Sequence, residues 1–281
     1  MDYEAYRADS RRRWEAAARG WEDRREAVRR AAAPVAQWLV DAAQIEPGAT
    51  VVEVACGLGD VGLLAAERVG AGGRVILTDG APPMVEAAER AIAASGLAHV
   101  EAQAMEAEWL DLDAATVDGI VSRWGYMLVA DPEAALREAR RVLRPGGRIA
   151  LAAWASQDQN PWIGVLQEQL VARGLASVPA PGTPGMFALA DHAHLADLLG
   201  AAGFMDVRIE PVPFVWEAPD ADAWWEHMRT TSISLGEAVA GLRPADHYAL
   251  RDAVDAGYAP YTQPDGSLRL PACALGATAE A

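Results

Sequence analysis

The feature that most constrains the fold is the alternation of short apolar segments with helix-forming segments along the first half of the chain. Apolar and β-branched residues dominate five short segments, and alanine-rich segments with helical spacing separate most of them. Strands that alternate with helices form a parallel sheet with right-handed crossovers. The predicted strands are residues 51–54, 74–78, 99–105, 117–124 and 148–154.

Two further predicted strands, residues 207–218 and 268–279, complete an α/β fold with a doubly wound, mostly parallel seven-stranded sheet and a helical cap. Residues 4–45 are expected to form two amphipathic helices that meet near Pro34, the first of which ends at about Val28. Another helix is predicted to end at Pro145.

The same pattern divides the chain into three parts. Residues 1–33 are predicted lid helices, and residues 34–157 are the predicted core. Residues 158–281 add the remaining strands, together with helical cap insertions at about 158–190 and 219–262.

Composition excludes several classes of protein. With 52% hydrophobic residues the chain is too apolar to be disordered, and its net charge of −16 repels polyphosphate. We therefore expect neither nucleic acid nor a membrane as a partner. No apolar segment approaches the ~20 residues of a membrane helix, and the charged first residues do not form a secretory signal, so the expected location is the cytoplasm. The oligomeric state is left open.

Cysteine usage and acidic clusters give no sign of a disulfide framework or a metal site. The chain has only Cys56 and Cys273, which we expect to be reduced and buried. No cluster of Asp, Glu and His side chains predicts a metal ligand set.

A glycine loop follows the first predicted strand. Gly57, Gly59 and Gly62 satisfy the G-x-G-x-x-G pattern, and Asp79 follows about 20 residues later at the end of the second strand. The glycines allow a ligand to approach the backbone closely, and the carboxylate of Asp79 can accept hydrogen bonds from two ribose hydroxyls. The pattern therefore predicts an adenosine-containing ligand.

Glu53, on the first strand, favours one adenosine ligand over another. A pyrophosphate near this carboxylate would be repelled by on the order of 1 to 4 kcal/mol, whereas an ammonium group would be attracted. S-adenosylmethionine carries an ammonium and a sulfonium and has no phosphate. The combination of Glu53, the glycine loop and Asp79 thus favours S-adenosylmethionine over NAD.

At this point the motifs resemble those of a known family. VVEVACGLGD, VILTDGAPPM, AMEAEWLDL, VDGIVSRWGYML and LRPGGRIALAAW are similar, in order and spacing, to motifs of the class I S-adenosylmethionine-dependent methyltransferases. Within that family the resemblance is to the ubiquinone/menaquinone C-methyltransferase-like branch, and it implies a Rossmann-like fold. It covers roughly residues 10 to 157.

The resemblance also implies roles for individual residues. It implies that Asp79 holds the ribose hydroxyls and that Glu106 accepts the adenine amino hydrogen, with Met84 packed beneath the ring. The other positions that it implies around the cofactor are Ala55, Gly57, Gly59, Gly80, Met105, Ala107 and Ser122. Gly80 and Met105 depart from the residues that are usual in the family.

Aromatic residues are the remaining candidates. Trp21 is expected near the sulfonium, where a ring gains cation–π energy, and Trp124, Tyr126 and Phe187 are expected to contact the substrate. Trp14 is expected to pack in the core. A pocket that also collects side chains of the cap would suit an aromatic, quinone-like acceptor; the candidates are Trp162, Met186, Trp224, Trp225, Met228, Tyr258 and Tyr261.

No catalytic base is predicted, because each of the five histidines is expected to be solvated or to cap a helix. The sequence predicts transfer of a methyl group to an oxygen, nitrogen or carbon atom of a small molecule. Two alternatives stay open at this point: an NAD(P)-dependent oxidoreductase that uses the same loop, and a protein that binds S-adenosylmethionine without methylating anything.

Overall fold

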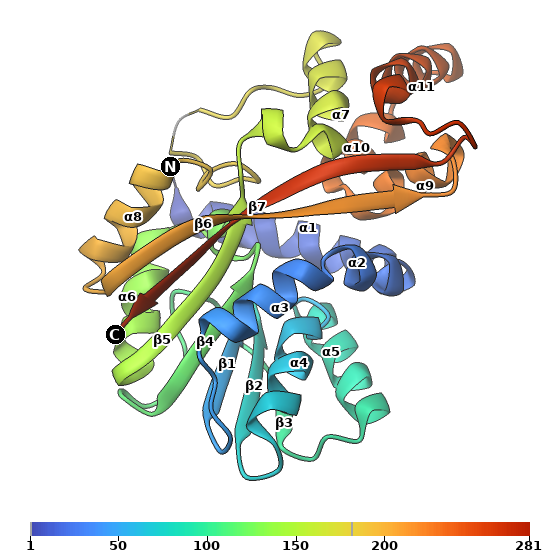
Figure 1. Ribbon diagram of the computed structural model, residues 1–281. Coiled ribbons are helices and arrows are strands. Elements are labelled where there is room, and N and C mark those ends of the chain that lie inside the picture. Colours follow the sequence, from blue (N-terminus) through green and yellow to red (C-terminus); the bar gives the residue numbers. More distant parts are fainter. Residues whose placement is uncertain (1, 181) are drawn as a thin grey trace.

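One twisted sheet of seven strands organises the computed structural model, which describes residues 2–180 and 182–281 (Figure 1). The strand order is β3-β2-β1-β4-β5-β7-β6, and only β7 runs antiparallel to its neighbours. The predicted mostly parallel, seven-stranded α/β sheet is confirmed. The strands are β1 (Thr50–Val54), β2 (Arg74–Asp79), β3 (Val100–Ala104), β4 (Val117–Arg123), β5 (Leu143–Trp154), β6 (Met205–Ala218) and β7 (Leu268–Glu280).

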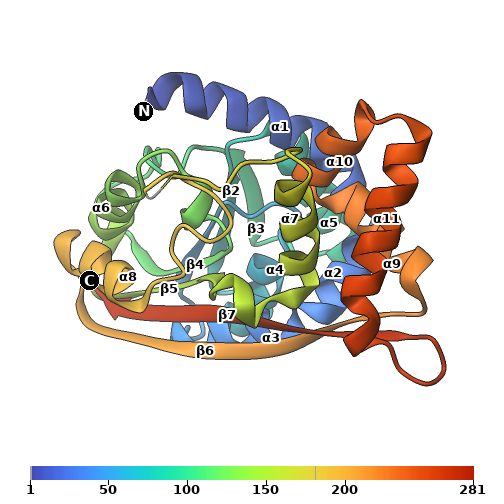
Figure 2. The same ribbon diagram turned by 90° about the horizontal axis from the view of Figure 1, so that it is seen from above.

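The central strands are apolar on both faces because helices cover both sides of the sheet. Val52 of β1 pairs with Ile76 of β2 and with Ile120 of β4, and all three side chains are buried. Helices α3, α4 and α5 pack on one side of the sheet, and α6 and α8 pack on the other (Figure 2). These helices are α3 (Ala33–Ala42), α4 (Asp60–Val69), α5 (Pro82–Ser95), α6 (Pro132–Val142) and α8 (His192–Ala201).

Strand β6 lies at the edge of the sheet and pairs only with β7. Its second half alternates between exposed and buried side chains, as expected for a strand with one solvated face. Pro211 and Pro213 interrupt its row of N–H groups, which an edge strand tolerates and a central strand does not.

The N-terminal segment forms three helices rather than the two that the sequence predicted. They are α1 (Tyr3–Asp23), α2 (Arg25–Ala31) and α3, so the first helix ends before Val28. Pro34 is the second residue of α3 and does not separate two helices. A proline is accepted there because the N–H groups of the first helical turn have no intrahelical partner.

The boundary between α6 and β5 also differs from the prediction. The helix ends at Val142, and the segment up to Pro145, predicted as helix, already belongs to β5. The end of the chain explains this change: the amide of Gly146 donates to Ala281, and the amide of Ala281 donates to Gly147. This pairing favours extended backbone where the local sequence alone indicates helix.

A group of helices lies over one end of the sheet. Figure 2 shows α1 along one margin of the molecule and α7, α9, α10 and α11 gathered at another; α1 packs against α5 and α9. The four gathered helices are α7 (Pro161–Ala172), α9 (Ala221–Thr231), α10 (Ile233–Ala240) and α11 (Pro244–Tyr258). The proposed division at residues 33 and 157 stays a prediction. Within the described ranges, no helix combines the length and apolarity needed to cross a bilayer.

Asn160 joins the start of this helical group to the sheet. Its side chain is fully buried just before α7, and its amide nitrogen donates to the carbonyl oxygens of Ala155, Ser156 and Cys273. Its amide oxygen accepts from the indole of Trp162 and from the backbone amide of Cys273. One side chain therefore ties β5, β7 and α7 together.

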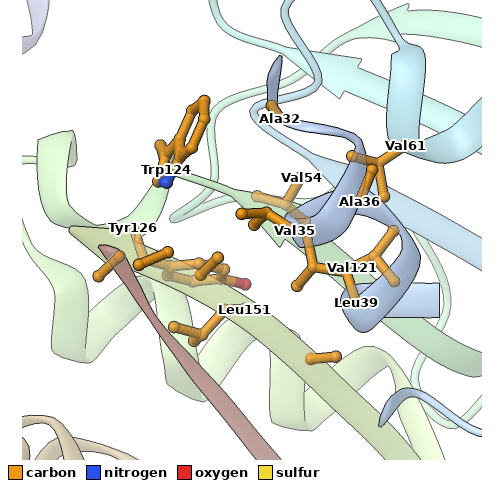
Figure 3. Packing of buried hydrophobic residues seen from close by; sticks show 14 of the residues in the cluster. Ala32, Val35, Ala36, Leu39, Val54, Val61, Val121, Trp124, Tyr126 and Leu151 are labelled. Carbon is orange, nitrogen blue, oxygen red and sulfur yellow. The ribbon is translucent and has the colours of Figure 1, made fainter. Parts of the chain in front are cut away.

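The core continues from the sheet into the first helices. Figure 3 shows side chains of α3, such as Val35 and Leu39, packed against Val54 and Val121 of the central strands. Tyr126 lies in the same cluster beside Leu151, and its hydroxyl is buried without a hydrogen-bond partner in the described residues. Cys56 and Cys273 are free and buried.

Candidate active site

A cavity of about 380 Å³ lies at the carboxyl ends of five parallel strands. Residues at or just after the ends of β1, β2, β3, β4 and β5 line it, and α1, α7, α9, α10 and β6 contribute to the other walls. The strand order reverses between β1 and β4, and α/β sheets bind ligands at such a switch point. The cavity therefore lies where the topology of the sheet places a site.

The glycine loop after β1 forms one wall through unusual backbone conformations. Ala55, Gly57 and Gly59 all have φ in the left-handed region, at 53°, 53° and 78°. Ala55 and Gly57 line the cavity, whereas Gly59 begins α4 and does not. Trp124, at the end of β4, is a second non-glycine lining residue with a positive φ, of 62°. Strained backbone of this kind is concentrated at functional sites.

Gly62, the third glycine of the loop, lies where no other residue fits. Its amide donates to Glu53, and a Cβ atom at this position would lie 2.8 Å from the Glu53 carboxylate and would overlap the buried Leu77. We expect Gly62→Ala to lower the free energy of unfolding by about 1 to 3 kcal/mol, because overpacking strains a core that cannot yield.

Chemical denaturation of the intact chain measures this effect. Gly72→Ala is the matched control, since a Cβ there meets nothing within 4 Å. Equal stabilities of the two variants would contradict the steric role of Gly62.

Glu53 is 2% exposed and lines the cavity beneath the loop. Its Oε2 accepts the amide of Gly62 at 2.7 Å. Burial raises the pKa of this carboxyl to about 8, against the opposing effects of that hydrogen bond and of the guanidinium of Arg123. A positive charge that comes close to Glu53 favours the ionised form of this carboxyl.

A small network of charges that the sequence did not reveal surrounds Glu53. Asp60 accepts two hydrogen bonds from Arg25, at 2.8 and 2.9 Å, and lies 3.8 Å from the guanidinium of Arg123. Asp60 and Arg123 line the cavity. Burial lowers the pKa of Arg123, and Asp60 opposes this effect. The glycine spacing gave no signal for either residue.

Asp79 ends β2 at the cavity wall. Its two carboxylate oxygens accept the backbone amides of Gly57 and Ala81, each at 2.9 Å, so the side chain is fixed against the glycine loop. Burial raises the pKa of this carboxyl, and the two backbone amides oppose the rise. A carboxylate oxygen has lone pairs left for further donors, so the hydroxyls of a ribose remain possible partners.

Glu106 and Gly80 form the neighbouring wall, together with Met105 and Ala107. A Cβ on Gly80 would lie 2.7 Å from the Glu106 carboxylate, so the glycine provides the space that this carboxylate occupies. Arg11 of α1 donates to the same carboxylate. The sequence gave no signal for this contact, because the two residues are 95 positions apart.

Trp14 and Trp21 bring α1 to the cavity. Their rings pack edge to face with centroids 5.7 Å apart, both line the cavity, and the Trp21 indole donates to the carbonyl of Thr231 in α9. Met84 and Leu58 pack against the same pair. Trp14 packs against this cluster as expected, and it also faces the cavity as Trp21 does.

The far end of the cavity is aromatic. Trp124 stacks on Trp154 with centroids 4.1 Å apart, and Trp154 contacts Trp162, which in turn contacts Trp216. All four rings line the cavity, as do Met186 and Met228. A surface of this kind accommodates a flat, apolar molecule.

Several predicted residues do not line this cavity. Ser122 is buried behind the wall, where its hydroxyl donates to the carbonyl of Val54. Tyr126 lies in the core described above, and Phe187 is partly buried beside the lining residue Met186. Four aromatic residues of the cap, Trp224, Trp225, Tyr258 and Tyr261, also lie outside the lining set.

His227 departs furthest from the prediction made for the histidines. The prediction that it is solvated or caps a helix is wrong, because its side chain is 7% exposed and lines the aromatic end of the cavity. His99, whose ring lies 3.0 Å from the carbonyl oxygen of Ala66, and His247, which packs on Trp225, are only partly buried.

His192 and His194 are exposed near the start of α8, as expected. In residues 2–180 and 182–281 no three His, Cys, Asp or Glu side chains are arranged to hold a metal ion.

The sheet order and the cavity at the strand ends define a Rossmann-like α/β protein. A solved structure supports this class: the YcgJ protein of Bacillus subtilis superposes with a TM-score of 0.58 over 87% of this chain and 97% of its own length, at 17% identity. A methyltransferase domain model matches residues 51–147.

Two curated relatives narrow the class. Nocamycin O-methyltransferase of Saccharothrix syringae is 33% identical over 199 residues, which cover 68% of this chain and 71% of the relative. The 2-phytyl-1,4-naphtoquinone methyltransferase of Thermosynechococcus vestitus is 35% identical over 63% of this chain and 81% of its own length.

The chain belongs to the class I S-adenosylmethionine-dependent methyltransferases, and its cofactor is S-adenosylmethionine. The predicted family, fold and cofactor are thereby confirmed, and the alternative of a nicotinamide-dependent oxidoreductase is set aside.

Proposed function

We propose that this enzyme methylates a small, apolar and aromatic molecule of the natural-product or quinone-like kind. The observation that carries the proposal is that one cavity has two chemically different ends. Two carboxyl groups, the buried Glu53 and the partly buried Asp79, lie beside the glycine loop at one end, and four tryptophans line the other. The first end suits a cationic amino acid and a ribose, and the second suits a flat acceptor.

The residues present fit S-adenosylmethionine at the first end. Glu53 would face its ammonium group and Asp79 its ribose hydroxyls, with Ala55 and Gly57 along the methionine part. Met84, Met105 and Ala107 would flank the adenine, and Glu106 would accept its amino hydrogen once Arg11 moves aside. The bound cofactor supplies an electrophilic methyl group, and the protein supplies its orientation toward the acceptor.

The names of the two relatives support the choice of acceptor. The first is named for nocamycin and the second for a phytyl-naphthoquinone, and both are small molecules. The acidic surface of this chain, with a net charge of −16, argues further against nucleic acid as the acceptor. The absence of nucleic-acid and membrane partners and the cytoplasmic location stay predictions.

Calorimetric titration of the purified chain with S-adenosylmethionine tests the cofactor end, with NAD as the control ligand. We expect saturable binding of S-adenosylmethionine alone, and at least about tenfold weaker binding in Asp79→Ala, the loss typical of hydrogen bonds to a charged group. Unchanged affinity in that variant would refute the ribose role. A gain of 14 daltons in aromatic test compounds, the mass of one methyl group replacing hydrogen, distinguishes methyl transfer from binding without methylation.

A further inference from the structure

His227 stands in an unusual place for an ionisable side chain. It projects from α9 into the aromatic end of the cavity, with its ring 5.1 Å from that of Trp224 and nearly parallel to it. On another side its ring lies 5.3 Å from Trp216. The imidazole is therefore held by aromatic packing rather than by polar partners.

The hydrogen bonds of His227 leave its ring available. Its backbone carbonyl accepts from the hydroxyls of Thr230 and Thr231, while the ring nitrogens have no protein partner in the part of the chain that the structure describes. Among the described lining residues after Arg123, His227 is also the only one with an ionisable side chain. Within the part of the lining that β5, β6 and the cap helices contribute, His227 is thus the one candidate for a proton transfer.

We propose that His227 is the general base of this enzyme and that the acceptor atom is the oxygen of an acidic hydroxyl, as in a phenol or an enol. This inference rests on the proposed function and deepens it, because it selects oxygen among the three acceptor atoms. A neutral amine needs no base before it attacks, whereas a hydroxyl becomes a good nucleophile only as it loses its proton.

The step balances in atoms and charge. The acceptor O–H bond breaks and its proton passes to an imidazole nitrogen of His227, while the oxygen forms a bond to the methyl carbon. The carbon–sulfur bond of the sulfonium breaks, and its electron pair stays on sulfur, which becomes a neutral thioether. One positive charge thus moves from the sulfonium to the imidazolium, where the faces of Trp224 and Trp216 can stabilise it.

The surroundings keep the imidazole neutral, so its ring carries a free lone pair, and they make it a weaker base than a solvated histidine. Burial lowers the pKa of His227 to about 4, and the guanidinium of Arg24 contributes to the shift. Arg24 lies between α1 and α2 and is itself 3.7 Å from Glu226 of α9, which also pairs with Arg229. The one carboxylate of α10, Glu237, is paired with Arg13 of α1. Strand β6 contributes only the uncharged ring of Trp216 to the contacts of His227.

Binding of 2-naphthol to the full chain loaded with S-adenosylhomocysteine tests the proposal without turnover. The matched ligand is 2-methoxynaphthalene, which has the same rings and no hydroxyl to donate. We expect the wild type to prefer the naphthol by about two- to tenfold, the contribution of one neutral hydrogen bond. In His227→Phe the preference should vanish, and in His227→Gln, which keeps an acceptor atom, it should persist.

His247→Phe is the matched control, since His247 packs against Trp225 and lies outside the cavity lining. It should keep the preference of the wild type. Methylation of 2-naphthol in His227→Phe should fall about 10²- to 10⁴-fold and recover as rising pH ionises the naphthol in solution.

A preference that survives in His227→Phe would overturn the proposal, and so would a rate that falls equally at every pH. A wild type that binds S-adenosylhomocysteine but neither binds nor methylates 2-naphthol would overturn the assignment of an aromatic hydroxyl. Failure to bind S-adenosylhomocysteine at all would instead overturn the proposed function.

Discussion

Replacement of Asn160 by alanine is expected to lower the free energy of unfolding by about 3 to 5 kcal/mol, since a buried polar group left without a partner costs about 1 to 3 kcal/mol. The change would leave the amide of Cys273 and the indole of Trp162 without their acceptor and would free the carbonyls of Ala155 and Ser156. All of these groups lie where the sheet meets α7, so the lost hydrogen bonds weaken both the sheet and the attachment of α7.

Urea denaturation of the intact chain measures the effect. Gln159→Ala is the control, because the neighbouring Gln159 is exposed and its substitution should change stability by less than about 0.5 kcal/mol. Partial unfolding should also appear as loss of the aromatic near-ultraviolet signal, since the rings of Trp162 and Trp154 pack against each other at a tilt, with centroids 4.9 Å apart. A variant as stable as the control would show that water replaces these hydrogen bonds.

The affinity for S-adenosylmethionine is expected to rise about tenfold per pH unit between about pH 5.5 and pH 7.5, by linkage to one ionisation. Burial raises the pKa of Glu53 to about 8, so the free enzyme holds this carboxyl mostly protonated across that range. An ammonium group binds the ionised form, and each binding event therefore releases a proton. Proton release weakens binding at low pH, which gives the sign of the effect.

Asp60, Asp79 and Arg123 face the same carboxyl and modify this profile. The two carboxylates raise the pKa of Glu53, and Arg123 lowers it. Above the window the ammonium of the cofactor itself loses its proton at an ordinary α-amino pKa of about 8, which reverses the trend.

Glu53→Gln separates these contributions, because the amide keeps the hydrogen bond from Gly62 and cannot ionise. We expect weaker binding and a nearly flat profile in this variant, measured by calorimetry in two buffers of different ionisation enthalpy so that the released proton is counted. A steep profile in the glutamine variant, or a flat one in the wild type, would assign the ammonium to another partner.

The sheet could be predicted from the sequence because the pattern that marks each strand is local. Val51, Val52 and Val54 are apolar and the segment ends at a glycine loop, so a buried strand follows from that local pattern, with Glu53 as its one charged residue. The breaks in the N-terminal helices were missed because distant residues decide them. The side chain of Arg24 bonds to Thr230, and Gly20 packs directly against the backbone of the same residue.

The residues of the site also divide into those that a local sequence pattern predicts and those that only the folded chain reveals. Glu53, Gly57 and Asp79 were predictable, since parallel strands bring their carboxyl ends together and the spacing of residues along the chain reports it. Neither Arg11 nor His227 carries a local signal. Each reaches the cavity from a helix that only the folded chain places there, and an isolated histidine in a sequence is more often solvated than catalytic.

The placement of the cap in the chain has a consequence for how such an enzyme diversifies. Helix α7 lies in the connection from β5 to β6, and α9, α10 and α11 lie in the connection from β6 to β7. Lengthening a connection changes the free energy of folding only slowly, and it leaves the pairing of the strands untouched. Part of the aromatic wall, including Trp162 and His227, therefore lies on stretches of sequence separate from the glycine loop, whereas Trp124 and Trp154 belong to the ends of β4 and β5. New acceptors can arise by replacement of these two connections while the glycine loop and its carboxylates stay as they are.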